Sequence, residues 1–319
     1  MSDIDTIDPA LVAASRRAAE DEPPVDFREL VDAPVTEIRA AYEATSAYWN
    51  ARPPALASVT DTTLDGPHGG LRARVYRPSD AVLPGLLYFH GGGFMLGSID
   101  THDTMCRLLA REAGAAVISV DYRLAPEYRF PVAIEECLFA CDWLIEQAAK
   151  VDVDATRLAV GGDSAGANLA LSVLNEKREP LRAGVLFYGC YGHLPEFGYP
   201  LGAAAKAYGD GRYGLGLDMM RRFYVDYLSD DADGLDPRFC SLRGDYHGLP
   251  PVLLTAAALD PLRDDAEAFR SHLEAAKVPH RYVLYPGMPH GFLKFAPEVD
   301  AALQGLRDAA NFLHGHWRH

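Results

Sequence analysis

The chain has 319 residues, a charged fraction of 24%, and 45 acidic against 30 basic side chains. Its net charge of −15 at pH 7 repels phosphate backbones and anionic lipid surfaces, so the composition argues against nucleic acid and membrane partners. A hydrophobic fraction of 49% is ordinary for a globular protein and predicts one large domain, alone or with a lid.

The first residues carry acids and lack the apolar core of a secretory signal. No apolar run approaches the roughly 20 residues that span a bilayer. The five cysteines include no Cys-x-x-Cys pair, and no His, Cys and carboxylate cluster has metal-ligand spacing. We therefore expect reduced thiols, no metal and a cytoplasmic protein.

Residues 1 to about 55 predict helices without strands, whereas from Leu71 onward short apolar strands alternate with helices. The expected elements are strands at 71–78 and 85–90, a helix at 103–114, a strand at 115–122, a helix at 132–150, a strand, tight turn and helix within 157–177, strands at 183–189 and 251–259, a helix at 265–277, a strand at 281–287 and a helix at about 299–314. This alternation predicts a mostly parallel sheet covered by helices on both faces.

Residues 191 to about 237 interrupt the alternation with a Gly- and Tyr-rich stretch, a short helix near 217–229 and an acidic loop. An insertion after a strand is a candidate cap. We therefore expect a helical N-terminal cap segment at 1–55 and a catalytic domain at 56–319 that carries a second cap segment at 191–237.

The pentapeptide GDSAG at 162–166 follows an expected strand and opens an expected helix, which is the context of a nucleophile elbow. The sharp turn needs small residues two positions before and two positions after the serine. At a helix N-terminus the backbone dipoles favour a developing negative charge. We expect Ser164 to be a nucleophile; the alternative is a glycine-rich turn with an incidental serine.

Three consecutive glycines follow another strand, in HGGGF at 90–94. Such a run does not favour a strand, but it lets backbone N–H groups point at a ligand oxygen. We expect the N–H groups of Gly92, Gly93 and Ala165 to form an oxyanion hole, where one donor lowers the barrier by roughly 3 to 4 kcal/mol. His90 is expected to orient this loop from behind, and a flexible linker is the alternative.

The general base must be chosen among 11 histidines. In hydrolases with a nucleophile elbow the chain order is serine, acid, histidine. His290 follows the last expected strand on a loop, whereas His272 lies within a helix. Asp260 ends a strand and can accept the Nδ1–H of His290, which fixes the tautomer. We predict His290 as the base and Asp260 as its acid, and we expect Asp264 and Asp265 to cap or solvate the next helix.

With these residues in place, the chain resembles the hormone-sensitive-lipase-like branch of the α/β-hydrolase esterases. The shared motifs are HGGGF at 90–94, DYRLAPE at 121–127, GDSAGAN at 162–168, DPLRDD at 260–265 and HGF at 290–292. Within the branch the chain is most similar to bacterial acetyl esterases. The resemblance implies the α/β-hydrolase fold with a helical cap, no cofactor, short-chain acyl esters as substrates, and supporting roles for Gly91 and Asp163.

The leading hypothesis is therefore a carboxylic ester hydrolase that acts on a small-molecule ester through an acyl-enzyme on Ser164. A non-catalytic module of the same fold, binding a small molecule or a regulatory protein, is the alternative, and retention of Ser164, Asp260 and His290 argues against it. An amidase or peptidase with the same triad also stays open. The sequence predicts neither the physiological substrate nor the oligomeric state.

Overall fold

A computed structural model describes residues 6–21, 23–192 and 194–317 of the chain. The start of the expected N-terminal segment (1–5), Glu22, His193 of the expected insertion and the C-terminal His319 lie outside the described residues. In the described part of the chain, no helix combines the length and the apolar character needed to cross a membrane.

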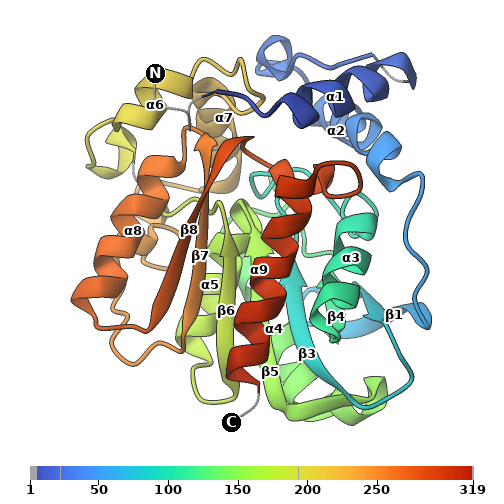
Figure 1. Cartoon of the computed structure of the whole chain (residues 1–319). Coiled ribbons are helices and arrows are strands. Elements are labelled where there is room, and N and C mark those ends of the chain that lie inside the picture. Colours follow the sequence, from blue (N-terminus) through green and yellow to red (C-terminus); the bar gives the residue numbers. More distant parts are fainter. Residues whose placement is uncertain (1–5, 22, 193, 318–319) are drawn as a thin grey trace.

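An eight-stranded sheet lies at the centre of the molecule (Figure 1), in the order β1-β2-β4-β3-β5-β6-β7-β8. Its strands are β1 (Ser58–Gly66), β2 (Gly69–Arg77), β3 (Leu83–Phe89), β4 (Ala116–Val120), β5 (Val153–Asp163), β6 (Leu181–Phe187), β7 (Val252–Leu259) and β8 (His280–Pro289). The β1–β2 and β2–β4 pairs are antiparallel, and the other pairs are parallel. The expected mostly parallel sheet is confirmed.

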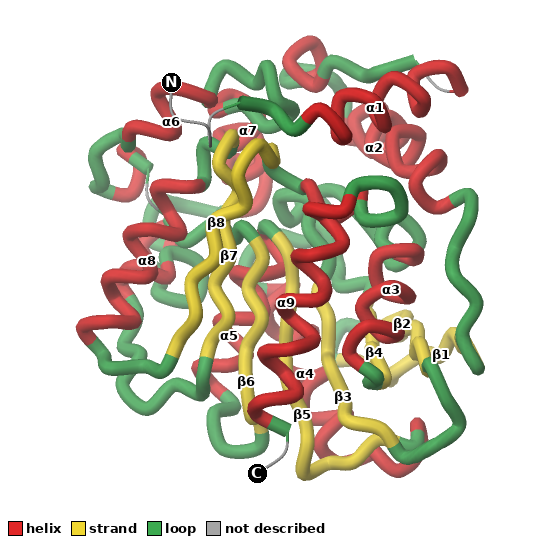
Figure 2. The backbone as a smooth tube through the Cα atoms, viewed as in Figure 1, coloured by secondary structure: helices red, strands yellow, loops and turns green. Residues whose placement is uncertain are grey.

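Helices cover both faces of this sheet (Figures 1 and 2). They are α1 (Pro9–Asp21), α2 (Val35–Asn50), α3 (Asp103–Ala113), α4 (Val132–Gln147), α5 (Ala165–Glu176), α6 (Ala203–Tyr208), α7 (Leu217–Tyr227), α8 (Arg263–Ala275) and α9 (Asp300–His316). Helices α3 and α9 pack on one face, and α4, α5 and α8 pack on the other. The order of strands and helices agrees with the expected α/β-hydrolase fold.

Neighbouring residues of the central strands belong to different apolar clusters. Leu86 and Val185 are buried beneath α3 and α9, while the next residues, Leu87 and Leu186, are buried beneath α4, α5 and α8. Successive side chains of a strand point to opposite faces. A strand that is apolar at almost every position therefore fits a sheet that is buried on both sides.

Strand β1 was not among the expected elements. It pairs with β2 alone, at the edge of the sheet, and of its side chains Leu64 is the buried one. Its Thr- and Asp-rich sequence gives little apolar signal, so the pairing with β2 determines its conformation.

Helices α1, α2, α6 and α7 lie together beyond one end of the sheet, at the top of Figure 1. A small apolar cluster joins two of them to the loop after β3: Ile38 of α2 and Phe223 of α7 pack with Met95 and Leu96. Segments far apart in the sequence thus meet over the loop that carries the three glycines.

Candidate active site

The turn between β5 and α5 holds Ser164 in a backbone conformation that side chains rarely adopt. Its φ is 54° and its ψ is −120°, in a sparsely populated region whose cost the surrounding structure must offset. The two flanking glycines leave no room for a side chain. A Cβ on Gly162 would collide with the carbonyl of Gly166, and a Cβ on Gly166 would collide with the carbonyl of Phe89. The turn thus places the hydroxyl at the N-terminus of α5.

The chain brings Ser164, His290 and Asp260 into one hydrogen-bonded row. The Nε2 atom of His290 lies 2.8 Å from the Ser164 hydroxyl oxygen, and its Nδ1 atom lies 2.7 Å from Oδ2 of Asp260. The second oxygen of Asp260 accepts the backbone N–H of Leu262 at 2.8 Å. Asp260 is 1% exposed, so its carboxylate is fixed by two bonds away from water. With Nδ1 protonated, Nε2 accepts a proton from the serine hydroxyl.

The glycine loop after β3 turns beside Ser164. Gly92 has a φ of 127° and Gly93 a φ of 61°, values that favour glycine. A Cβ on Gly92 would collide with the carbonyl of Leu96, and one on Gly93 would collide with the ring of Phe223. Within the described residues, no acceptor is bonded to the N–H groups of Gly92, Gly93 and Ala165.

Asp163 ties this loop to the nucleophile turn. Its Oδ1 accepts the N–H of Gly91 at 3.0 Å and the hydroxyl of Tyr88 at 2.8 Å, and Nε2 of His102 lies 3.5 Å away. Burial acts to raise the pKa of Asp163, but the charge and hydrogen bond of His102 and the Tyr88 hydroxyl outweigh it and lower the pKa. An ionised carboxylate therefore lies directly behind both loops.

His90 lies behind the glycine loop and does not line the cavity that holds Ser164. Its Nδ1 atom is 2.8 Å from the carbonyl of Gly91, and its ring stacks on Tyr122 at 4.4 Å. Burial, with the charge of His102, lowers the pKa of His90 to about 4. A neutral ring that donates from Nδ1 holds the Gly91 carbonyl in one orientation.

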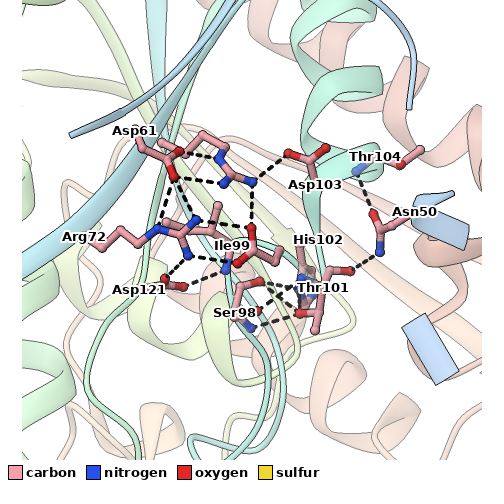
Figure 3. Close-up of polar contacts among 12 residues, drawn as sticks. Asn50, Asp61, Arg72, Ser98, Ile99, Thr101, His102, Asp103, Thr104 and Asp121 are labelled. Atoms are coloured by element: carbon pink, nitrogen blue, oxygen red, sulfur yellow. Dashed lines mark hydrogen bonds and ion pairs between the residues drawn. The ribbon is translucent and has the colours of Figure 1, made fainter. Parts of the chain in front are cut away.

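A polar network beside this site holds the loop that carries His102 (Figure 3). Arg72 and Arg74 of β2 form ion pairs with carboxylates from β1, the residue after β4, the loop before α3 and the first residue of α3. These carboxylates belong to Asp61, Asp100, Asp103 and Asp121. Asp121 also accepts the N–H of Ile99 at 2.6 Å. These ion pairs and hydrogen bonds thus fix the backbone that positions His102 against Asp163.

A cavity of about 170 Å³ opens onto Ser164 and His290. Its walls come from α2, α7, the glycine loop, the loops after β5 and β8, and the 3₁₀ helix η2 (Phe27–Leu30). Among the described residues, no group of three or more His, Cys, Asp and Glu side chains could hold a metal ion. Ser164, His290 and the glycine loop line this cavity together, beside Tyr42, Tyr188 and Lys294.

A protein-family model described as the alpha/beta hydrolase fold matches residues 86–294, which span the glycine loop, the nucleophile turn and His290. The chain belongs to this family.

Known members of the family cover most of the chain. An ethyl acetate hydrolase from Pseudomonas putida is 38% identical over 284 residues, which are 85% of this chain and 86% of that protein. An acetyl esterase from Salmonella typhi is 34% identical over 288 residues, covering 88% of this chain and 87% of the relative. These likenesses support the resemblance to hormone-sensitive-lipase-like esterases.

Solved structures agree. A hyperthermophilic esterase from the archaeon Pyrobaculum calidifontis has a TM-score of 0.89 and 36% identity, covering 97% of this chain and 98% of that one. A thermostable carboxylesterase cloned from a metagenomic library has a TM-score of 0.86 and 37% identity, covering 91% and 99%. The α/β-hydrolase described here is a carboxylesterase.

Two acids at the start of α8 make contacts that the sequence did not predict. Asp265 is 2% exposed and accepts the N–H groups of Tyr191 and Gly192 at 2.6 and 3.0 Å. Asp264 accepts the N–H of Ala205 at 3.0 Å. Both acids lie in the first turn of α8, as expected, and these side-chain hydrogen bonds also join the helix to the backbone of the segment after β6.

Sequence reasoning also missed residues that line the esterase cavity. Tyr42 of α2 and Lys294 both face it, and neither belongs to a motif that indicated chemistry. The position of Lys294, four residues after His290 in the segment that follows β8, was the available signal. For Tyr42 no such signal exists, since its place depends on how α2 packs over the sheet.

Proposed function

We propose that this carboxylesterase hydrolyses short-chain acyl esters through an acyl-enzyme formed on Ser164. The observation that carries the proposal is the pair of hydrogen bonds from His290, at 2.8 Å to Ser164 and at 2.7 Å to Asp260. The names of the ethyl acetate hydrolase and the acetyl esterase among the relatives support small acyl groups as substrates.

In the first step, Nε2 of His290 takes the proton of the Ser164 hydroxyl while Oγ attacks the ester carbonyl. Asp260 stabilises the imidazolium and keeps its own charge. The imidazolium then gives its proton to the departing alcohol oxygen. In the second step, His290 takes a proton from water, which attacks the acyl carbonyl, and the proton returns to Oγ as the acid leaves.

We assign stabilisation of the tetrahedral intermediate to the N–H groups of Gly92, Gly93 and Ala165. Their lack of acceptors within the described part of the chain and the fixed turn of the loop support this role. Donors that are already oriented need no rearrangement as the oxyanion develops, and each contributes roughly 3 to 4 kcal/mol. The bonds from Gly91 to Asp163 and to His90 position the loop.

We further propose that the N-terminal segment (1–55) and the segment 191–237 act together as the cap that limits acyl length. The cavity is small, and Met219, Met220 and Phe223 of α7 form its apolar wall. Each methylene that fits gains up to about 0.8 kcal/mol of burial, and a longer chain loses its alignment with Ser164. The rate constant kcat/KM is therefore expected to peak between acetyl and roughly hexanoyl esters.

The test is a rate profile over p-nitrophenyl esters from acetyl to dodecanoyl for the wild type, Ser164→Ala and Ser271→Ala. Ser271 is exposed on α8 and serves as the matched control. Ser164→Ala is expected to lower turnover by on the order of 10⁴ or more with unchanged circular dichroism. A folded Ser164→Ala variant that keeps a few percent of wild-type turnover contradicts the nucleophile, and a peak at dodecanoyl contradicts the cap.

A further inference from the structure

Lys294 is a cation in the wall of the active-site cavity. It belongs to the 3₁₀ helix η7 (Phe292–Phe295) and lines the same cavity as Ser164 and His290. The residue is exposed, yet protein surrounds its ammonium group closely enough for burial to lower the pKa of Lys294 to about 8. These two properties coexist where a side chain faces a hollow rather than open solvent.

No carboxylate in the described residues pairs with this ammonium group. Its one recorded contact is with the ring of Phe295, at 5.1 Å from the centroid. The nearest acid along the chain, Glu298, is already bonded to Arg17 at 2.6 Å and to the hydroxyl of Tyr48 at 2.8 Å. A cation that faces a cavity and has no carboxylate partner is available to pair with the charge of a ligand. A charged side chain of this kind beside a nucleophile is typical of a group that binds the opposite charge of a ligand.

The cavity has two walls of different chemistry. Helix α7 contributes Met219, Met220 and Phe223, which are apolar. A second wall is made by α2 and η7. Phe295 packs edge-on against Trp49 of α2 at 4.9 Å, and the ammonium group of Lys294 lies over the same Phe295 ring, so Lys294 is on the side of α2. Ser46 and Asn50 of α2 also line the cavity. Because α2 also contributes the rings of Tyr42 and Trp49 to this wall, the positive charge lies on the wall that mixes aromatic and polar side chains.

We propose that Lys294 determines specificity by binding an anionic oxygen group, a carboxylate foremost, on the part of the ester that lies against α2. The substrates it would select are short esters that carry one carboxylate, such as monoesters of dicarboxylic acids or acyl esters of hydroxy acids. The proposal rests on the proposed function, because it concerns which esters reach Ser164. With a net charge of −15, the protein as a whole repels such anions, so a local contact must attract them.

The experiment compares matched anionic and neutral esters by pH-stat. Monoethyl succinate carries its carboxylate on the acyl side, and diethyl succinate is its neutral partner. Acetoxyacetate carries its carboxylate on the alcohol side, and its methyl ester is the neutral partner. The quantity measured is the ratio of kcat/KM for the anionic ester to that for its neutral partner. Hydrogen bonds to charged groups predict that Lys294→Met lowers this ratio by about 10- to 100-fold in one of the two pairs, and that Lys294→Glu lowers it further.

Lys150→Met is the control, because Lys150 lies in η3 (Ala148–Val151) before β5, at the opposite end of that strand from Ser164. It removes the same charge and is expected to leave both ratios unchanged. If Lys294→Met changes neither ratio by more than twofold while neutral esters are hydrolysed, Lys294 does not select anions and the proposed function stands. If the wild type hydrolyses none of the four esters, the proposed function fails together with this inference.

Discussion

At the residue scale, His90 shows how burial converts a titratable group into a fixed hydrogen-bond donor. Its neutral ring donates to the Gly91 carbonyl, and the backbone carbonyl of His90 accepts the Tyr122 hydroxyl at 2.6 Å. Since the ring is sealed from water, a proton on it would have no compensating solvation. As a result, the stability of the native protein is expected to fall at acid pH, which can be measured.

Because burial and His102 lower the pKa of His90 to about 4 from 6.5, the unfolded chain binds a proton at this site between these values while the native chain does not. Native stability therefore falls as the pH drops through this window. His90→Asn keeps an N–H donor near the position of Nδ1 but does not titrate. Urea unfolding at pH 7 and pH 5 is expected to show a loss about 2 kcal/mol smaller in the variant. Equal losses in both proteins would contradict a neutral, buried His90.

The catalytic candidates were accessible to sequence reasoning at this scale because each depends on local context. Ser164 needs a strand, a turn with two glycines and a helix, and chain order then singles out Asp260 and His290. The structure brings these three side chains together. Lys294 could not be identified in the same way, because its role depends on the lack of an ion pair to any carboxylate in the described chain, which only the packed structure reveals.

At the element scale, one arginine fastens α2 to the catalytic loops. Arg39 donates to the carbonyls of Met95 and Ala125 at 2.9 and 2.8 Å. It also forms a bidentate ion pair with the carboxylate of Glu127, at 2.7 and 2.8 Å. Met95 follows the glycine loop, so α2 and the loop are held as one unit. The wall of the cavity that carries Tyr42 and Trp49 depends on this attachment.

Arg39→Ala is therefore expected to lower the free energy of unfolding by on the order of 2 to 3 kcal/mol and to raise KM for p-nitrophenyl acetate several-fold. Arg270→Ala on α8 removes an exposed i,i+4 pair with Glu274 and should cost less than about 0.5 kcal/mol. Urea midpoints and KM values of both variants provide the measurement. A loss for Arg39→Ala no larger than for the control would show that α2 is held mainly by its apolar face.

Helices and strands with a strong apolar pattern could be predicted from the sequence. Those whose conformation depends on contacts with another segment could not. The central strands β5 to β7 are buried on both faces, so their sequence alone indicates them. Strand β1 and the short helix α6 lack such a signal. Asp265 shows the same limit, because its bonds to Tyr191 and Gly192 join segments that are distant in the sequence.

At the scale of the whole molecule, the five cysteines are dispersed through the core and none is paired. Burial raises the pKa of every one of these thiols, which makes them poor nucleophiles in the native state. Thiol titration under denaturing, non-reducing conditions is expected to count five free groups, and the native protein should react slowly. A count of three would reveal a disulfide and argue against the expected cytoplasmic location.

The charge of the molecule and the chemistry of its cavity act in opposite directions. A net charge of −15 disfavours binding to anionic lipid surfaces. The apolar side chains of α2 and α7 that are buried beside the cavity pack against each other. The whole molecule thus favours small dissolved esters, while Lys294 offers a local exception for those that carry a carboxylate.

The central claim is that hydrolysis passes through a covalent bond to Ser164, and covalent labelling tests it most directly. Diethyl p-nitrophenyl phosphate should phosphorylate the Ser164 oxygen with release of p-nitrophenolate, in parallel with the loss of esterase activity. Mass spectrometry of peptides is expected to find one diethylphosphoryl group per inactivated chain, on Ser164, and none on Ser164→Ala. Complete inactivation with the label on another residue, or equal labelling of Ser164→Ala, would contradict the account.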